Sequence, residues 1–274
     1  MYLEAILAHK KEEIKKKKRT RPFVDPPEKR GDLSIRSSPG GNPPGVHPSG
    51  RSRFRSAVSA PGIAVVAEIK RASPSRGPIA PGLDPVKTAV LYEENGAAAI
   101  SVLTEEKFFR GGYHDLRAVR AVTKLPVLAK DFFIDPCQVE EAAAAGADAI
   151  LLIMAILSRG QAAELAACAR EYGLAVLAEV HKEEELEAAL ATGPDLIGIN
   201  NRDLKTFRVS LETTFRIHPL VPKEYPVISE SGIKNHRDLL ALSALGVDGF
   251  LIGETLAGSR DPGAALRELL EGRP

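Results

Sequence analysis

Eight short apolar runs, each followed by a segment of helical character, constrain the fold of this chain more than any other feature of its sequence. Each run is rich in aliphatic residues and ends in polar ones, and a glycine often stands before the next run. The runs span residues 64–70, 98–103, 127–130, 149–153, 175–180, 196–200, 227–230 and 249–252. Strands and helices that alternate in this way are typical of βα units, whose strands lie parallel in one sheet.

The helical segments carry their own start and stop signals. Asp84 and Pro85 predict an N-cap and a first helical residue, because the φ of proline suits that position. The glycines that follow helical segments as candidate C-caps are Gly96, Gly146, Gly173, Gly193 and Gly246. Eight βα units in succession close into a barrel more naturally than they form an open sheet. The predicted fold class is therefore α/β, a (β/α)8 TIM barrel, and periodicity alone leaves a doubly wound sheet as the alternative.

An extra helix is predicted before the barrel, over residues 3–18. Lysine and glutamate cover most of its surface, as in an amphipathic helix that packs along one side. The apolar residues that share its one stripe are Leu3, Ile6, Leu7 and Ile14. The lysines at 15–18 are interpreted as a solvated face of this helix.

The segment between Arg21 and Gly50 differs sharply in composition, with seven prolines and five glycines in thirty residues. So many residues that interrupt helices and strands predict a mobile linker rather than a regular element. We expect residues 1–60 to hold the N-terminal helix and this linker, and residues 61–274 to form one barrel domain, the catalytic one.

The charge balance argues against a polyanionic partner. The chain has 37 basic and 36 acidic residues, a net charge of +1, so the positive surface of a nucleic-acid-binding protein is not expected. No apolar run reaches the ~18 residues of a membrane span. The N-terminal segment is charged and lacks the apolar core of a signal peptide, and a cytoplasmic enzyme without a membrane partner is expected.

Cysteine and histidine give no metal or redox pattern. Cys137 and Cys168 have no CxxC spacing and no histidine at ligand spacing, so reduced, buried thiols are expected rather than a disulfide or a zinc site. The histidines, which form no triad, are interpreted as surface or capping residues: His9, His47, His114, His181, His218 and His236.

Polar residues stand where the apolar runs end, which in a barrel is the face that carries the active site. Glu68 and Lys70 are two residues apart and so share one face of the first strand. The ends of later strands carry Lys130 and Asp131, Glu179, Asn200, Asn201 and Arg202, Glu230 and Ser231, and Gly253 and Glu254. Any one of them alone fits a solvated charge or a structural ion pair. Their coincidence on several strands favours an acid–base site.

Small residues after the last two strands predict a phosphate site. The loops after strands seven and eight of many barrels bind phosphate through backbone N–H groups, which requires glycine or small residues. Ser231-Gly232 and Gly253 fit this requirement, and the Ser73 and Ser75 hydroxyls can add donors. The chain has neither a Walker motif nor GxGxxG, so no nucleotide cofactor is expected.

Six segments match one known family in order. They are VAEIKRASPSRG (66–77), LAKDFFID (128–135), LAEVH (177–181), IGINNRDL (197–204), ISESGI (228–233) and LIGETL (251–256). Together they resemble indole-3-glycerol-phosphate synthase from Phe54 to the C-terminus. The N-terminal helix resembles the family's extra helix, which packs near the barrel mouth. The segment from Arg21 to Gly50 departs from the family, since it is richer in proline and glycine than the compact connection expected there.

The resemblance implies a carboxy-lyase (a decarboxylase) of tryptophan biosynthesis that works without a cofactor or metal. Its reaction closes the ring of 1-(2-carboxyphenylamino)-1-deoxyribulose 5-phosphate to give indole-3-glycerol phosphate, with loss of carbon dioxide and water. The resemblance makes Lys130 the general acid, Glu179 the general base and Lys70 a substrate contact and second acid. Glu68 would orient the lysines. Asn200 and Glu230 would bind the reacting region.

The resemblance also assigns the binding residues. The phosphate would fall to Ser73, Ser231, Gly232, Gly253 and the backbone at Glu254. Arg202 would form a wall or anchor of the site, and Phe132 would either stack on the aromatic ring of the substrate or pack in the core. A small phosphorylated molecule is the expected partner, with a monomer or a weak homo-oligomer as the expected state.

Two other kinds of protein remain open at this point. One is another phosphate-binding barrel, either a phosphoribosyl isomerase or a thiazole-synthase-like enzyme with a lysine Schiff base. Neither gives a reason to combine Glu68 and Lys70 with Lys130, Glu179 and Asn200. The other is a non-catalytic barrel that serves as a scaffold, and in such a protein the polar residues at the strand ends should have been lost. Every motif position is filled here.

Overall fold

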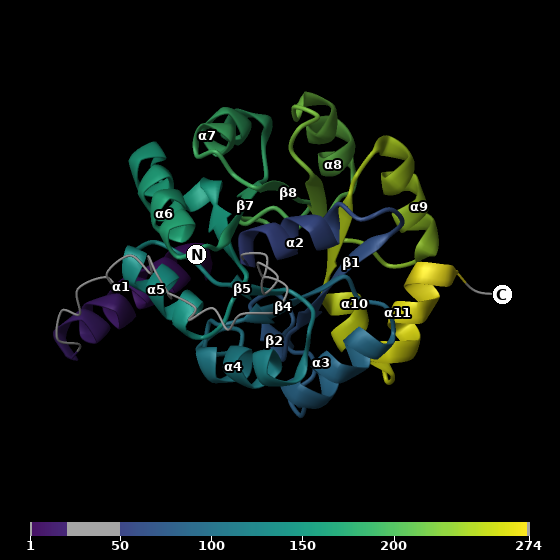
Figure 1. Cartoon of the computed structure of the whole chain (residues 1–274), viewed down its shortest axis with the longest axis horizontal. Helices are drawn as coiled ribbons and strands as arrows, with labels where there is room; N and C mark the ends of the chain where they lie inside the picture. The colour runs from purple at the N-terminus through teal and green to yellow at the C-terminus, as the bar shows by residue number, and fades with distance from the viewer. Residues whose placement is uncertain (1, 21–49, 273–274) are drawn as a thin grey trace, which may run out of the picture.

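The computed structural model describes residues 2–20 and 50–272. Eight parallel strands form a closed barrel in the order β1-β10-β9-β8-β7-β6-β5-β4 (Figure 1). Their bounds are β1 Ala64–Ile69, β4 Ala99–Leu103, β5 Val127–Lys130, β6 Ala149–Ile153, β7 Ala175–Val180, β8 Leu196–Asn200, β9 Val227–Glu230 and β10 Gly249–Ile252. The predicted barrel is confirmed, and six of the strands have the predicted bounds while β1 and β4 are one residue shorter.

Helices cover the outside of the barrel. They are α3 Pro85–Glu94, α4 Tyr113–Val122, α5 Pro136–Ala144, α6 Arg159–Glu171, α7 Leu186–Ala191, α8 Glu212–Ile217, α9 His236–Leu245, α10 Glu254–Ala257 and α11 Pro262–Glu271. Short 3-10 turns occupy Met154–Ile156, Glu183–Glu185 and His218–Leu220, and a small hairpin of β2 Ala72–Ser73 and β3 Gly77–Pro78 lies in the loop after β1. The predicted cap at Asp84 is confirmed, because its side chain accepts hydrogen bonds from Val86 N and Lys87 N.

The five glycines predicted as C-caps all have a positive φ, between 61° and 104°. Only Gly246 is itself the C-cap, and each of the other four lies one residue after the C-cap. This left-handed conformation is strained for residues with a Cβ atom, which explains why glycine stands at these turns.

Alternate residues of each strand face the two halves of the core. In β1, Val65 and Ala67 pack with the surrounding helices, whereas Val66 packs inside the barrel. Glu68 lies two residues after Val66 and so has the inward direction at the end of the strand. The alternation of inward and outward residues that packs the core therefore also points the Glu68 carboxylate into the barrel mouth.

Helix α2, Gly50–Val58, closes the opposite end of the barrel and was not predicted (Figure 1). Phe54 and Val58 are completely buried, and they pack in one cluster with residues inside the barrel. Arg51 lies 2.5 Å from Asp195 and Arg53 lies 2.9 Å from Asp148, which ties the helix to the strands' N-terminal ends. Apart from Gly50, the predicted linker lies outside the described residues, and the division of the chain at residue 60 stays a prediction.

The predicted N-terminal helix is confirmed as α1, Tyr2–Thr20, and it lies beside α5 on the rim of the barrel (Figure 1). Ile6 and Ile14 are buried, as the stripe predicted. The prediction of a solvated lysine face was wrong for Lys17, whose side chain is 34% exposed, whereas Lys18 is 56% exposed and also forms an ion pair. Lys17 contacts Glu141 at 2.8 Å, and Lys18 contacts Asp135 at 2.6 Å, because both lie on the side of α1 that meets α5 and its N-cap.

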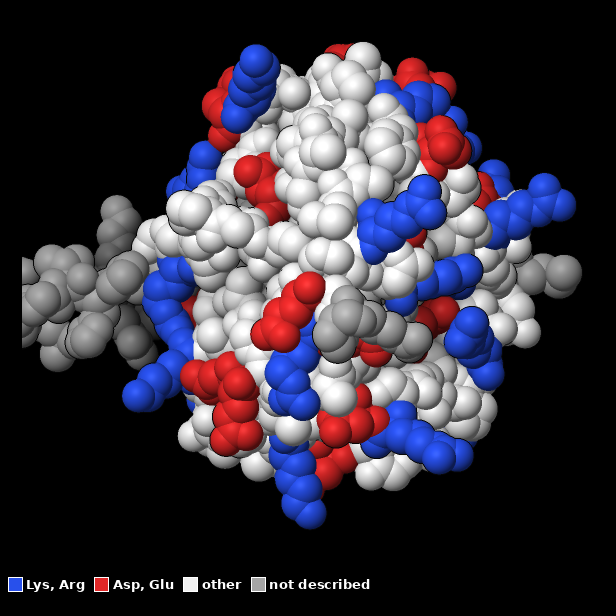
Figure 2. Space-filling view, turned by 90° about the vertical axis from the view of Figure 1, so that its right-hand side faces the viewer, with Lys and Arg blue, Asp and Glu red and all other residues white. Residues whose placement is uncertain are grey.

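Figure 2 shows basic and acidic side chains interspersed over one side of the molecule, in keeping with the small net charge. Within residues 2–20 and 50–272, no helix is both long enough and apolar enough to cross a membrane.

The barrel floor gives a first prediction. Phe54→Ala should lower the free energy of unfolding by about 3–5 kcal/mol, because it removes a fully buried ring and leaves a cavity. Urea denaturation followed by circular dichroism measures this loss. The matched control is Phe215→Ala, at a ring that is 36% exposed, where a change of roughly 0.5 kcal/mol is expected. Equal losses for the two variants would contradict a core role for Phe54.

Candidate active site

The C-terminal ends of the strands surround two adjoining cavities. The first is largely apolar, and its walls include Leu3 and Ile6 of α1. The second lies over the loops after β9 and β10 and is more polar. The residues that line both cavities are Lys70, Lys130, Arg202, Ser231 and Glu254. The two cavities therefore form one site with an apolar and a polar half.

The apolar half is built by three separate parts of the chain. Phe132 follows β5, and its ring centroid lies 6.2 Å from that of Phe109 in the loop after β4. Leu204 and Phe207, from the loop after β8, complete the wall opposite α1. A flat aromatic ring fits such a lining, since aromatic and aliphatic side chains offer contact without competing polar groups.

Glu68 links two lysines at the boundary between the halves. Its Oε1 lies 2.6 Å from Lys70 Nζ, and its Oε2 lies 3.3 Å from Lys130 Nζ. Burial alone would raise the pKa of Glu68, but the nearby charges of Lys130 and Lys70 outweigh this effect and lower it to about 2. The carboxylate therefore keeps its negative charge in a site from which water is largely excluded.

The Lys130 ammonium stands at the end of β5, among three carboxyl groups. Burial lowers the pKa of Lys130, yet Glu68, Glu230 and Glu179 together raise it above its ordinary value. Lys130 thus remains a cation, with its charge facing the cavity. A fixed cation in a poorly hydrated cavity stabilises negative charge that develops on a bound molecule.

Glu179, at the end of β7, lies on the strand across the cavity and is held by neighbouring side chains. Asn200 Nδ2 donates a hydrogen bond to Glu179 Oε2 at 3.0 Å, and His181 Nε2 lies 3.4 Å from Glu179 Oε1. Burial lowers the pKa of His181, but the charges of Glu179 and Glu185 outweigh this and raise it. Of the residues described, both carboxylates nearest this imidazole favour its charged form.

Glu230, at the end of β9, is 1% exposed and lines neither cavity. Burial and the charge of Glu179 raise the pKa of Glu230 well above its ordinary range, which favours a protonated carboxyl. Gly198 on β8 makes this position possible, since a side chain there would collide with Glu230 Oε1.

The polar half has the backbone of an anion site. Ser231 has φ 67° and Gly232 has φ 86°, so two successive residues take the left-handed conformation after β9. Such a conformation is rare for serine and is often found at functional sites. Gly253 approaches the Glu68–Lys70 pair so closely that a Cβ atom would collide with Glu68. Ser231, Gly232 and Gly253 all line the polar cavity.

Two arginines and one glutamate stand at the entrance. Arg202 Nη2 donates a hydrogen bond to Glu254 Oε1 at 2.7 Å, and Arg76 lies 3.4 Å from the same carboxylate. Arg202 Nη1 also lies 3.5 Å from Ser75 Oγ. The carboxylate of Glu254 holds the loop after β1 and the loop after β8 together.

The structure brings the predicted site residues to one end of the barrel. All of them except Glu230 and Asn201 line at least one of the two cavities. Asn201 is buried instead and donates a hydrogen bond to Ser229 Oγ. The interpretation of every histidine as a surface or capping residue was wrong for His181, which is 8% exposed beside Glu179. Its place in the LAEVH segment, two residues after Glu179, was the signal that could have found it, because alternate residues share one face.

Further residues at the mouth were missed, including Arg76 and the buried Lys10 of α1. Cys137 and Cys168 are free thiols, and both are half-buried rather than buried as predicted. In the described part of the chain, no group of three or more His, Cys, Asp or Glu side chains is arranged to hold a metal ion.

Known proteins share both the sequence and the fold. The family model for indole-3-glycerol phosphate synthase matches residues 3–269. The indole-3-glycerol phosphate synthase 2 of Ralstonia nicotianae is 51% identical over 211 residues, which cover 77% of this chain and 79% of that protein. The indole-3-glycerol phosphate synthase of Caldanaerobacter subterraneus is 46% identical over 255 residues, 93% of each chain.

Solved structures agree on the architecture. A thiamine phosphate pyrophosphorylase from Pyrococcus furiosus has a TM-score of 0.55 and 25% identity, and covers 78% of this chain and 95% of that one. A 3-hexulose-6-phosphate synthase from Salmonella typhimurium has a TM-score of 0.57 at 15% identity, and covers 76% and 97% of the two chains. The first of these shares the barrel, and the second shows the fold alone. Since the family model spans nearly the whole barrel and α1, the chain belongs to the indole-3-glycerol phosphate synthase family.

Proposed function

We propose that Lys130 and Glu179 are the general acid and the general base with which this chain, as an indole-3-glycerol phosphate synthase of tryptophan biosynthesis, closes the indole ring. The substrate is 1-(2-carboxyphenylamino)-1-deoxyribulose 5-phosphate. The observation that carries the proposal is that a half-buried ammonium, that of Lys130, and a buried carboxylate, that of Glu179, line the same largely apolar cavity. The site has one part for each part of the substrate. The apolar half suits the aromatic ring, Lys130 and Glu179 lie at the reacting carbons, and the loops after β9 and β10 suit the phosphate.

Binding is proposed to divide the substrate between the two halves. The carboxyphenyl ring lies against Phe132 in the apolar half. The phosphate lies over Ser231, Gly232 and Gly253, whose backbone approaches the polar cavity. Ser73, Arg202 and the backbone at Glu254 complete the phosphate side. This orientation places the ketone of the sugar near the lysines.

Ring closure needs an acid at the ketone oxygen. The aromatic carbon that bears the carboxylate attacks the ketone carbon, a new carbon–carbon bond forms, and the electron pair of the C=O bond moves to oxygen. The Lys130 ammonium stabilises this oxygen and donates a proton to it. Its raised pKa keeps the ammonium charged until the oxygen becomes basic enough to take the proton.

Loss of carbon dioxide and water follows. The C–CO2 bond breaks, and its electron pair restores the aromatic ring. The hydroxyl formed in the first step then leaves as water after protonation by a lysine, while Glu179 accepts a proton released on the other side of the new ring. Asn200 fixes the Glu179 carboxylate in position, through the hydrogen bond described above. Glu230 stays beside this base without reaching the cavity.

Lys70 shares the acid's task in this proposal. The ammonium groups of Lys70 and Lys130 both contact the Glu68 carboxylate, and Lys70 lines both cavities. Lys70 therefore contacts the substrate and serves as the second acid, and Glu68 orients both lysines. The protein's location in the cytoplasm and its monomeric or weakly associated state stay predictions from the sequence.

The reaction itself is the first test. Purified protein with the carboxyphenylamino-deoxyribulose phosphate, and with no added nucleotide or metal, should form a product with indole fluorescence. Lys130→Ala should lower kcat by about 100- to 10,000-fold with a smaller change in KM, because the acid acts in the chemical steps. Lys87→Ala, at an exposed lysine of α3, is the control and should be unaffected. No turnover between pH 6 and 9 would refute the function, whereas an unchanged kcat would transfer the acid's role to Lys70.

The phosphate loop gives a second test. Gly232→Ala should raise KM by about 10- to 100-fold, which corresponds to one or two lost hydrogen bonds to a charged group. A side chain there would crowd Val209 and Leu211 at φ 86°, so the loop would shift. Gly173→Ala is the matched control, with φ 70° in open space near the floor. It should cost stability but leave KM unchanged. Equal KM values for both variants would contradict the phosphate site.

The pH dependence of stability tests the role of Glu68. Its pKa is depressed to about 2 in the folded protein, so its ion pairs stabilise the fold above its ordinary pKa of about 4.5 and lose this effect as the pH falls toward 2. Glu68→Gln should therefore be less stable than the original protein at pH 7, by up to about 3 kcal/mol. The difference should shrink between pH 4.5 and 2. Urea denaturation at several pH values measures it, and a difference that stays constant would contradict the shifted pKa.

A further inference from the structure

Helix α1 buries a lysine in the middle of its apolar stripe. Lys10 lies four residues from both Ile6 and Ile14, and it is 2% exposed. Burying an unpaired ammonium costs several kcal/mol of free energy, so the partners of Lys10 determine whether α1 can remain packed against the barrel.

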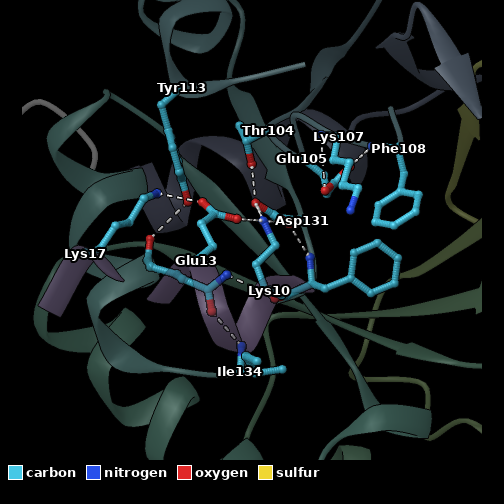
Figure 3. A network of polar contacts seen from close by, with 12 residues as sticks. Lys10, Glu13, Lys17, Thr104, Glu105, Lys107, Phe108, Tyr113, Asp131 and Ile134 are labelled. Atoms are coloured by element: carbon cyan, nitrogen blue, oxygen red, sulfur yellow. Dashed lines mark hydrogen bonds and ion pairs between the residues drawn. The ribbon is translucent and has the colours of Figure 1, made fainter. Parts of the chain in front are cut away.

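The partner across the interface is Asp131, directly after β5. Lys10 Nζ lies 3.0 Å from Asp131 Oδ1 and 3.1 Å from its Oδ2, and 3.0 Å from Glu13 on its own helix (Figure 3). Burial lowers the pKa of Lys10, but Asp131 and Glu13 outweigh it and raise the value. Lys10 therefore keeps its charge, and its contact with Asp131 joins residues 121 positions apart.

The Asp131 carboxylate also fixes the chain around it. Oδ2 accepts a hydrogen bond from Thr104 Oγ1 at 3.1 Å, and Oδ1 accepts one from the backbone N of Phe132 at 2.7 Å (Figure 3). These bonds hold the end of β5 to the end of β4. The two sequence neighbours of Asp131 are Lys130 and Phe132, and both line the apolar cavity.

We infer that Lys10 is a positioning residue for the ring-closing reaction: by neutralising Asp131 it holds the turn that carries Lys130 and Phe132. This inference rests on the proposed function, in which Lys130 is the acid. Without Lys10, Asp131 is a buried carboxylate beside the acid, with no cation across the interface to α1. Its negative charge then opposes the oxyanion that forms on the ketone, and the turn shifts to hydrate the carboxylate. Ile6, on the same face of α1, loses its fixed place in the cavity wall.

The predicted loss of activity comes from the unpaired charge of Asp131, not from the loss of a packing contact. This distinction separates a positioning role for Lys10 from a merely structural one. Lys10→Met keeps the length of the side chain and removes its charge. It should lower kcat on the order of 10- to 100-fold, the effect of a small misplacement of a catalytic group. Lys10→Arg, which keeps the charge, should retain most of the activity. Lys15→Met, at an exposed lysine of the same helix, should change neither kcat nor KM.

The double variant Lys10→Met/Asp131→Asn tests the charge argument. With the carboxylate removed, the double variant should recover a kcat close to that of Asp131→Asn alone and above that of Lys10→Met. Losses that simply multiply would overturn the inference, as would a kcat of folded Lys10→Met equal to that of the original protein. All rates are measured well below the unfolding temperature of each variant, so that unfolding does not enter the comparison.

A second measurement separates this inference from the function. Amide hydrogen exchange of α1 should accelerate in Lys10→Met and recover in the double variant, whether or not the substrate is turned over. If the original protein is inactive but shows this exchange pattern, the proposed function is refuted, whereas the role of Lys10 in holding α1 on the barrel is retained. Unchanged exchange in Lys10→Met would overturn the seating role in either case.

Discussion

The buried carboxylate of Glu68 is the interaction on which the site depends. It brings two ammonium groups to the same place, and without it Lys70 and Lys130 would repel each other across a cavity with little water. The strand supplies its direction, because Glu68 continues the inward row of Val66. Core and site thus share one strand, and the periodicity that packs the barrel also determines where the negative charge lies.

The sequence predicted the barrel well, because each strand is a short apolar run that glycines and helix caps separate from its neighbours. It also predicted which side chains gather at the mouth, since the ends of parallel strands meet at one face of a barrel. Their roles stay proposals: periodicity places Lys130 and Glu179 on one cavity, but it does not say which group holds a proton. That depends on burial and on charges brought together from β1, β5, β7 and β9.

The features that sequence reasoning missed are made by contacts between distant segments. Helix α2 carries three arginines among short polar residues, and its burial is evident only once Asp148 and Asp195 are placed opposite. Lys10 resembles any other lysine of a basic helix until Asp131 meets it. The lack of a triad or metal pattern predicted a surface or capping role for His181, although its spacing from Glu179 gave a local signal.

Helices α1 and α2 pack at opposite ends of the barrel, α1 on the rim of the mouth and α2 across the floor, and this has a consequence for the order of assembly. The partners of Lys10, Arg53 and Arg51 lie 121, 95 and 144 residues later in the chain. Neither helix can reach its final place until much of the barrel has been synthesised and folded, because contacts so distant in sequence require large loops to close. Both helices are synthesised before the strands that they contact, yet they are among the last elements to reach their final place. The mouth therefore acquires its α1 wall only after the strands below it are folded.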